Sequence, residues 1–106
     1  MTAPALDALT NPPSNLIGGQ YHPIEGQDLV SHDPAQRGRV VWSGSPNVQH
    51  VGQAVEAARS ALREWSRWNI EKRADVLLKY KAIVQERAGD IADLIAQETG
   101  KALWDC

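Results

Sequence analysis

The sequence predicts a region of short strands that contains a hairpin and is followed by two or three amphipathic helices. Two observations support this prediction. Runs of β-branched and aromatic residues between turn residues occupy positions 15–44, and apolar residues at steps of three and four occupy positions 45–101. We therefore divide the chain into a flexible arm at residues 1–14, the strands at 15–44 and the helices at 45–106.

Composition limits the classes of protein to which the chain can belong. The 106 residues carry a formal net charge of −2 with both signs interspersed, so we expect no nucleic acid partner. No apolar run approaches the ~20 residues of a membrane span, and the first residues lack the pattern of an export signal. We expect neither insertion into a membrane nor export. The single cysteine, Cys106, cannot form an internal disulfide, which fits the cytoplasm.

Short strands are expected between the arm and the helices. Residues 16–21 form one candidate strand, in which Gly18-Gly19 marks a close approach of backbones or a turn. A second extended segment at residues 28–32 ends before Asp33-Pro34. Residues 34–38 have the composition of a turn, and residues 39–43, with two valines and a tryptophan, suit a half-buried strand. The last two segments therefore form a predicted hairpin.

The first helix is expected to begin at Ser45-Pro46, because serine caps free amides and proline tolerates the first turn. Its apolar stripe consists of Val48, Val51, Val55, Ala58, Leu62 and Trp65, and Ala54, Ala57 and Ala61 flank it. We expect Arg59, Arg63, Glu64 and Arg67 to lie largely on the opposite, solvated face. Trp65 and Trp68 mark the end of the helix and favour a structural role.

A second helix is expected to be capped by Asn69, with Glu71 in its first turn. Its apolar stripe follows Ala74, Leu77, Leu78, Lys81, Val84 and Ala88, with the aliphatic stem of Lys81 lying along it. Gly89 predicts a break near residues 86–89. A third segment then carries Ile91, Leu94 and Ile95, and Gly100 is the expected left-handed cap, followed by Lys101.

Several motifs occur in an order and spacing that resemble the aldehyde dehydrogenase family. Residues 17–21 resemble its I-N-G-x-W strand, and residues 33–41 resemble its N-P-x-T-G-E-V-I hairpin, with Gly18 replacing Asn and Arg39 replacing Glu. Residues 54–65 resemble A-V-x-A-A-R-x-A-F-x-x-W, with Leu62 replacing Phe, and Glu98-Thr99-Gly100-Lys101 matches in form and position. Within the family, Trp42, Gly44 and Trp104-Asp105 are similar to a group of semialdehyde dehydrogenases that act in arginine breakdown.

The resemblance implies an α/β parent protein with a Rossmann-type nucleotide-binding domain, of which this chain is the N-terminal part. In such enzymes a cysteine attacks the aldehyde, hydride passes to NAD, and water activated by a glutamate releases the acid. The family places its G-Q-x-C nucleophile loop, its base and its nucleotide-binding loop beyond residue 106. We therefore expect no catalytic or cofactor-binding residue here, and an inactive fragment. Cys106 lacks the nucleophile's context, and the sequence does not distinguish NAD from NADP.

Metal binding is expected only through the resemblance. His22, His32 and His50 match no zinc spacing. Some members of the family hold a monovalent cation, with a carboxylate matching Glu98 and backbone carbonyls matching Ser31 and His32 as ligands. Oxygen ligands suit such a hard cation. The alternative is that Glu98 only caps or pairs within the protein.

Two functions from different classes remain. The first is a homo-oligomeric oxidoreductase that acts on a small-molecule aldehyde. The second is a non-enzymatic helical interaction module, in which the apolar stripe of the first helix binds a partner. A coding frame that continues to a G-Q-x-C loop supports the enzyme, and a stop codon after Cys106 supports the module. From the 106 residues in isolation we expect self-association or swapping, because the strands and the stripe lack their cover.

Overall fold

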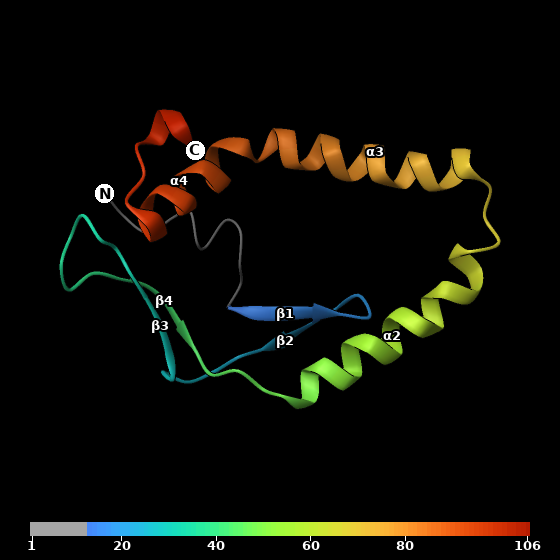
Figure 1. Cartoon of the computed structure of the whole chain (residues 1–106), viewed down its shortest axis with the longest axis horizontal. Coiled ribbons are helices and arrows are strands. Elements are labelled where there is room, and N and C mark those ends of the chain that lie inside the picture. The colour runs from blue at the N-terminus through green and yellow to red at the C-terminus, as the bar shows by residue number, and fades with distance from the viewer. Residues whose placement is uncertain (1–12) are drawn as a thin grey trace.

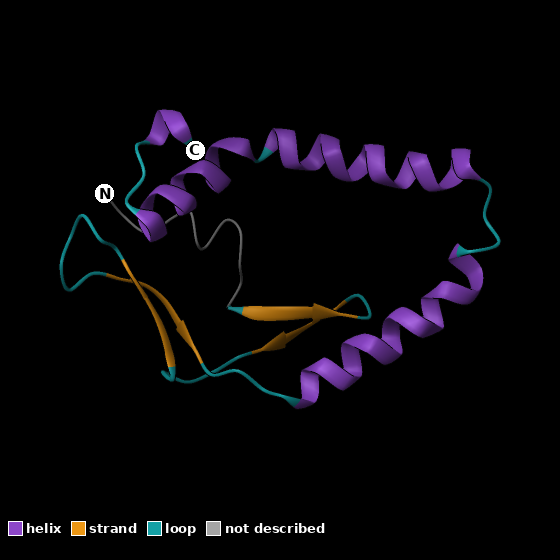
Figure 2. Ribbon diagram, viewed as in Figure 1, coloured by secondary structure: helices purple, strands orange, loops and turns teal. Residues whose placement is uncertain are grey.

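The computed structural model describes residues 13–106, and a strand region precedes the helices as expected (Figures 1 and 2). The predicted arm at residues 1–14 lies outside the described residues except for Pro13 and Ser14, and Ser14 already belongs to the first strand. None of the helices in the described part is long and apolar enough to cross a membrane. The elements are β1 (Ser14–Ile17), β2 (Gln20–Pro23), β3 (Leu29–His32), β4 (Val40–Gly44), α2 (Gln49–Trp65), α3 (Ile70–Glu86), α4 (Ala88–Thr99) and the 3-10 helix η1 (Leu103–Asp105).

The first two strands form an antiparallel hairpin rather than the single strand expected over residues 16–21. Gly18 and Gly19, with φ of 59° and 78°, make the two-residue turn between them. Such a turn needs positive φ at both central positions, and its twist matches that of the flanking strands. Of the two interpretations of the glycine pair, the turn is therefore correct. The register places Leu16 opposite Tyr21.

The second hairpin confirms the prediction for residues 28–43. β3 and β4 pair antiparallel, and an irregularity in the register lies between Ser31 and His32. Backbone hydrogen bonds close the turn, from the Asp33 amide to the Arg39 carbonyl at 3.0 Å and from the Gln36 amide to the Asp33 carbonyl at 3.3 Å. Val41 of β4 is 5% exposed and is the one buried apolar residue among residues 13–106.

The start of the first helix differs from the prediction. α2 begins at Gln49, and its first amide donates to Asn47 Oδ1 at 3.0 Å. Ser45 does not cap the helix, because its side chain and amide face the strands: Oγ accepts from the Asp28 amide and the Ser45 amide donates to the Ile24 carbonyl. Residues 45–48 therefore connect β4 to α2 and do not belong to the helix.

The later helix boundaries are as expected. Asn69 Oδ1 caps α3 by accepting from the Lys72 amide at 2.9 Å. The chain breaks at Arg87, between α3 and α4, inside the predicted interval. Gly100 ends α4 with φ of 72°, the left-handed cap that the sequence predicts. Beyond it, Lys101 Nζ lies 3.5 Å from Asp105 Oδ2.

The helices splay apart instead of closing around a core (Figure 1). The radius of gyration is 16.8 Å, against about 13 Å for a compact domain of this length. α2 packs on β1 through its alanine side, where a Cβ on Gly18 would lie 3.9 Å from Ala57 Cβ. Four apolar residues of the predicted stripe, hereafter the valine stripe, stay exposed: Val48, Val51, Val55 and Leu62.

α3 is even less covered than α2. It has no buried residue, and Leu77, Leu78 and Tyr80 are all more than half exposed. Its apolar residues spread well beyond one stripe, and a helix that is apolar over most of its circumference is typically buried in its complete protein. Within residues 13–106 this helix contacts α4, but most of its predicted apolar stripe stays exposed.

Candidate functional site

A half-buried polar joint connects α4 to the second hairpin. Glu98, near the end of α4, accepts two hydrogen bonds on one carboxylate oxygen: Ser31 Oγ of β3 donates to Oε1 at 2.9 Å, and Trp42 Nε1 of β4 donates to the same atom at 2.5 Å. Hydrogen bonds to an ionised carboxylate are stronger than those between neutral groups. Glu98 therefore holds two strands and one helix together.

The end of α4 makes a second contact with the same hairpin. A Cβ built on Gly100 would lie 3.3 Å from Cβ of Pro34, the first residue after β3 and Asp33. Glycine is thus favoured here both by its positive φ and by the close approach of Pro34. Thr99 continues the motif: its Oγ1 donates to the Ile95 carbonyl at 2.7 Å and accepts from the Lys101 amide at 3.2 Å. The motif at residues 98–101 is a structural joint in this chain.

An ion pair lies at the turn of the second hairpin. Arg39 Nη1 lies 3.7 Å from Asp33 Oδ2, and Asp33 is only 7% exposed. The other oxygen, Oδ1, accepts from the Ala35 amide at 2.9 Å. The Nη2 atom of Arg39 is buried without a hydrogen-bond partner in the structure. This pair fixes the turn on which Gly100 rests.

Two histidines meet where the first hairpin contacts α2. His50, in the first turn of α2, is 8% exposed, and Asn15 Nδ2 of β1 donates to its Nδ1 at 3.0 Å. The His22 ring of β2 stands edge-on to His50 with centroids 5.4 Å apart. His32 lies elsewhere, at the end of β3. Among residues 13–106, no cluster of three or more His, Cys, Asp or Glu residues is arranged to hold a metal.

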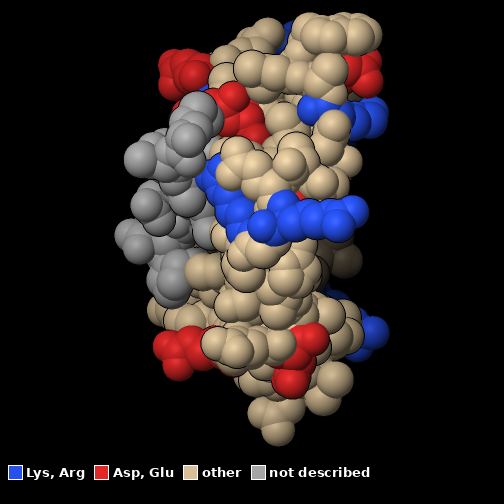
Figure 3. All heavy atoms as spheres, turned by 90° about the vertical axis from the view of Figure 1, so that its left-hand side faces the viewer, with Lys and Arg blue, Asp and Glu red and all other residues tan. Residues whose placement is uncertain are grey.

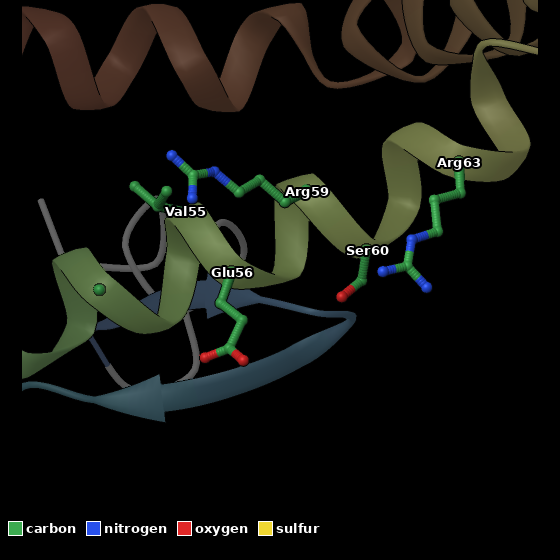
Figure 4. A pocket seen from close by; sticks show the side chains of 6 residues that line it. Val55, Glu56, Arg59, Ser60 and Arg63 are labelled. Atoms are coloured by element: carbon green, nitrogen blue, oxygen red, sulfur yellow. The ribbon is translucent and has the colours of Figure 1, made fainter.

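A shallow depression of about 540 Å³ follows the outer side of α2 (Figure 4). One helix lines all of it, through Gly52, Val55, Glu56, Arg59, Ser60 and Arg63. A site that converges on a reacting group needs side chains from several directions. This depression therefore has no resemblance to a catalytic pocket.

The residues proposed from the sequence as cation ligands are brought together in part. Glu98 and Ser31, 67 positions apart, share a hydrogen bond, and His32 is the next residue along β3. Trp42 was not among the expected site residues, although it donates to the same carboxylate oxygen. Its place opposite Ser31 in the register could have indicated it, since both side chains then lie on one face of the hairpin.

The remaining predicted features carry no site in the described residues. Cys106 is exposed, and its thiol donates to the Ala102 carbonyl at 3.3 Å. On the face that shows the second hairpin and α4, basic and acidic side chains are interspersed among uncharged ones (Figure 3). No strong field of one sign distinguishes this face.

Comparisons with known proteins complete the description of the site. The model of the aldehyde dehydrogenase family matches residues 22–106. The N-succinylglutamate 5-semialdehyde dehydrogenase of Ectopseudomonas mendocina is 37% identical over 93 residues, which cover 87% of this chain and 19% of the relative. N-succinylglutamate 5-semialdehyde dehydrogenase 2 of Caulobacter vibrioides is 41% identical over 91 residues, covering 85% and 19%.

A third relative gives the same picture. The N-succinylglutamate 5-semialdehyde dehydrogenase of Paraburkholderia xenovorans is 37% identical over 91 residues, covering 85% of this chain and 18% of the relative. No solved structure matches the chain. The chain thus spans about a fifth of the length of the curated relatives that it matches.

Proposed function

This chain belongs to the aldehyde dehydrogenase family, and we propose that it is the N-terminal part of an enzyme that oxidises N-succinylglutamate 5-semialdehyde to the acid with NAD. The motif-based resemblance to the family and to this group within it is confirmed by the relatives' names. The observation that supports this substrate is the 37–41% sequence identity to those relatives. A role in arginine breakdown, in the cytoplasm, belongs to the same proposal.

In this proposal residues 1–106 have no catalytic role by themselves. The joint at Glu98, the ion pair at Asp33 and the histidine pair each connect secondary structure elements. His50 also lines an open hollow of about 510 Å³ between β1, the start of β3 and the start of α2, and the other residues that line this hollow have apolar or amide side chains without a nucleophile or an acid. The nucleophile, its base and the NAD-binding loop would come from other parts of the enzyme. The segment supplies outer strands and first helices of a Rossmann-type domain, and the enzyme assembles as a homo-oligomer.

The exposed helices support a longer parent protein over an independent module. The valine stripe and the apolar residues of α3 would be buried against the rest of the enzyme. Full burial of one such side chain contributes about 1.5–3 kcal/mol, so leaving a series of them in water is costly. An interaction module would also use such a face, but the relatives are about five times longer than this chain, which favours the enzyme.

The test is an assay of the complete enzyme and of residues 1–106 in parallel. We expect NADH to form from N-succinylglutamate 5-semialdehyde with the complete enzyme, and no NADH to form with residues 1–106. Glutamate 5-semialdehyde and succinate semialdehyde, at matched concentrations, serve as control substrates, and NADP serves as the control cofactor. Equal rates with all three aldehydes would contradict the substrate, and faster turnover with NADP would contradict the cofactor.

A monovalent cation bound by Glu98 with the backbone carbonyls of Ser31 and His32 is a second proposal. The observation in its favour is the hydrogen bond from Ser31 Oγ to Glu98 Oε1, which holds the carboxylate beside β3. The fit is partial, because Glu98 Oε1 already accepts two hydrogen bonds and only Oε2 is left for a cation. The test is the melting temperature of the complete enzyme in potassium, sodium or choline chloride. Equal values in all three salts would leave Glu98 as a structural acceptor alone, and Glu98→Gln should abolish any difference.

A further inference from the structure

α2 has two apolar sides, and within residues 13–106 the alanine side is the one that packs on the first hairpin. The alanine side, with Ala54, Ala57 and Ala61, lies beside Leu16 and Ile17 of β1. The valine stripe is 83%, 67%, 47% and 57% exposed at Val48, Val51, Val55 and Leu62 in turn. Val48 and Val51 border an open hollow that they share with β1, and Val55 and Leu62 lie outside it. Water-exposed apolar stripes that extend over most of a helix mark an interface.

Arg59 borders the valine stripe and has no partner in the described chain. It follows Val55 by four positions and precedes Leu62 by three, so it lies beside both on the helix surface. Val55, Arg59 and Arg63 line the same depression, but the Arg59 side chain extends toward α3 and the Arg63 side chain extends away from it (Figure 4). Neither of the ion pairs formed within residues 13–106 includes Arg59. Arg59 is exposed in residues 13–106, as expected from the sequence, but it lies at the edge of the valine stripe and not opposite to it.

We propose that the valine stripe is covered by a segment of the complete enzyme outside residues 1–106, and that this segment carries an Asp or Glu that pairs with Arg59. The inference rests on the proposed function, which supplies the longer polypeptide: the relatives extend to about five times the length of this chain. A segment that buries Val55 and Leu62 also removes water from the guanidinium between them. A desolvated guanidinium requires a hydrogen-bonded counter-charge, and a carboxylate fits its planar fork best.

The test compares Arg59 with Arg63, which lies one turn later on the same helix. The complete enzyme is treated with phenylglyoxal, an arginine-specific reagent, and both sites are followed by peptide mass spectrometry. We expect Arg59 to react at least tenfold more slowly than Arg63. Equal reaction of the two side chains would overturn the proposal.

Substitutions then test the counter-charge. We expect Arg59→Met to lower the apparent melting temperature of the complete enzyme by roughly 2–4 °C, Arg59→Lys to recover part of the loss, and Arg63→Met to have no effect. An Arg59→Met enzyme as stable as the unmodified one would refute the buried carboxylate. Dissociation of Arg59→Met into smaller species in sedimentation would assign the stripe to a second copy and overturn the proposal. The proposed function is tested separately, by the aldehyde oxidation assay of the unmodified enzyme. An enzyme that oxidises no aldehyde would contradict the proposed function without bearing on Arg59.

Discussion

The joint at Glu98 leads to a prediction that can be measured on a single hydrogen atom. In the structure the indole N–H of Trp42 is bonded to Glu98 Oε1, whereas the Trp104 ring is 88% exposed. Glu98→Ala removes the acceptor of that bond. We therefore expect the Trp42 indole hydrogen to be protected from exchange with solvent in the unmodified chain and to lose this protection in the variant.

The magnitude follows from the charge and burial of the pair. A hydrogen bond to a charged group contributes about 1.5–3 kcal/mol, and partial access of water to these half-buried residues favours the lower end. A loss of about 1.5 kcal/mol corresponds to a roughly tenfold shift in the local opening equilibrium that permits exchange. The Trp42 indole should thus exchange about tenfold faster in Glu98→Ala than in the unmodified chain.

The assay is hydrogen exchange of the indole signals in two-dimensional NMR spectra of the 106-residue chain. Trp42→Phe identifies the signal of Trp42, and the Trp104 signal is the internal reference for an exposed indole. Glu56→Ala, which removes an exposed carboxylate from α2, is the matched control and should change nothing. Our account of the joint is wrong if Trp42 exchanges as fast as Trp104 in the unmodified chain, or if Glu98→Ala leaves its rate unchanged.

Three further predictions concern the helices. Gly100→Ala should lower the free energy of unfolding by about 1–2 kcal/mol, because φ is 72° and Pro34 is close; Gly89→Ala, whose Cβ meets nothing within 4 Å, should not lower it. Chemical denaturation of the two variants measures both. Asn69→Ala should lower the free energy of unfolding by about 1 kcal/mol, because α3 loses its cap. Circular dichroism at intermediate urea should then show reduced helix content. Residues 1–106 in isolation should self-associate in ultracentrifugation, and Val51→Lys should weaken this; a monomer with a cooperative melt would contradict the exposed stripe.

Two of the residues that are similar to one group within the family, Trp42 and Gly44, contribute to packing in this structure. Trp42 was noticed in the sequence as a mark of one group of enzymes, and the structure shows its indole bonded to the glutamate of the family's own motif. Gly44 is confined by Ile24, the residue that follows β2, since a Cβ on Gly44 would lie 2.6 Å from the Ile24 carbonyl oxygen. Both residues thus stabilise the arrangement of the two hairpins and α4.

Local features were determined by the sequence itself. The glycine cap at Gly100, the Asn69 cap and the break near Arg87 depend on residues within a few positions of one another, and all three agree with the structure. The turn at residues 34–38 is local in the same sense. The family too was evident, because the order of its short motifs is a property of the sequence.

Only the tertiary structure decided which residues meet. The spacing of α2 predicts apolar sides but not that the alanine side takes the hairpin while the valine stripe stays open. Ser45 has the chemistry of a cap, yet contacts with Asp28 and Ile24 hold it at the strands. Glu98 was singled out by its motif, but its two donors come from strands 56 and 67 positions away. Such contacts depend on how the chain returns on itself, and no local pattern contains that information.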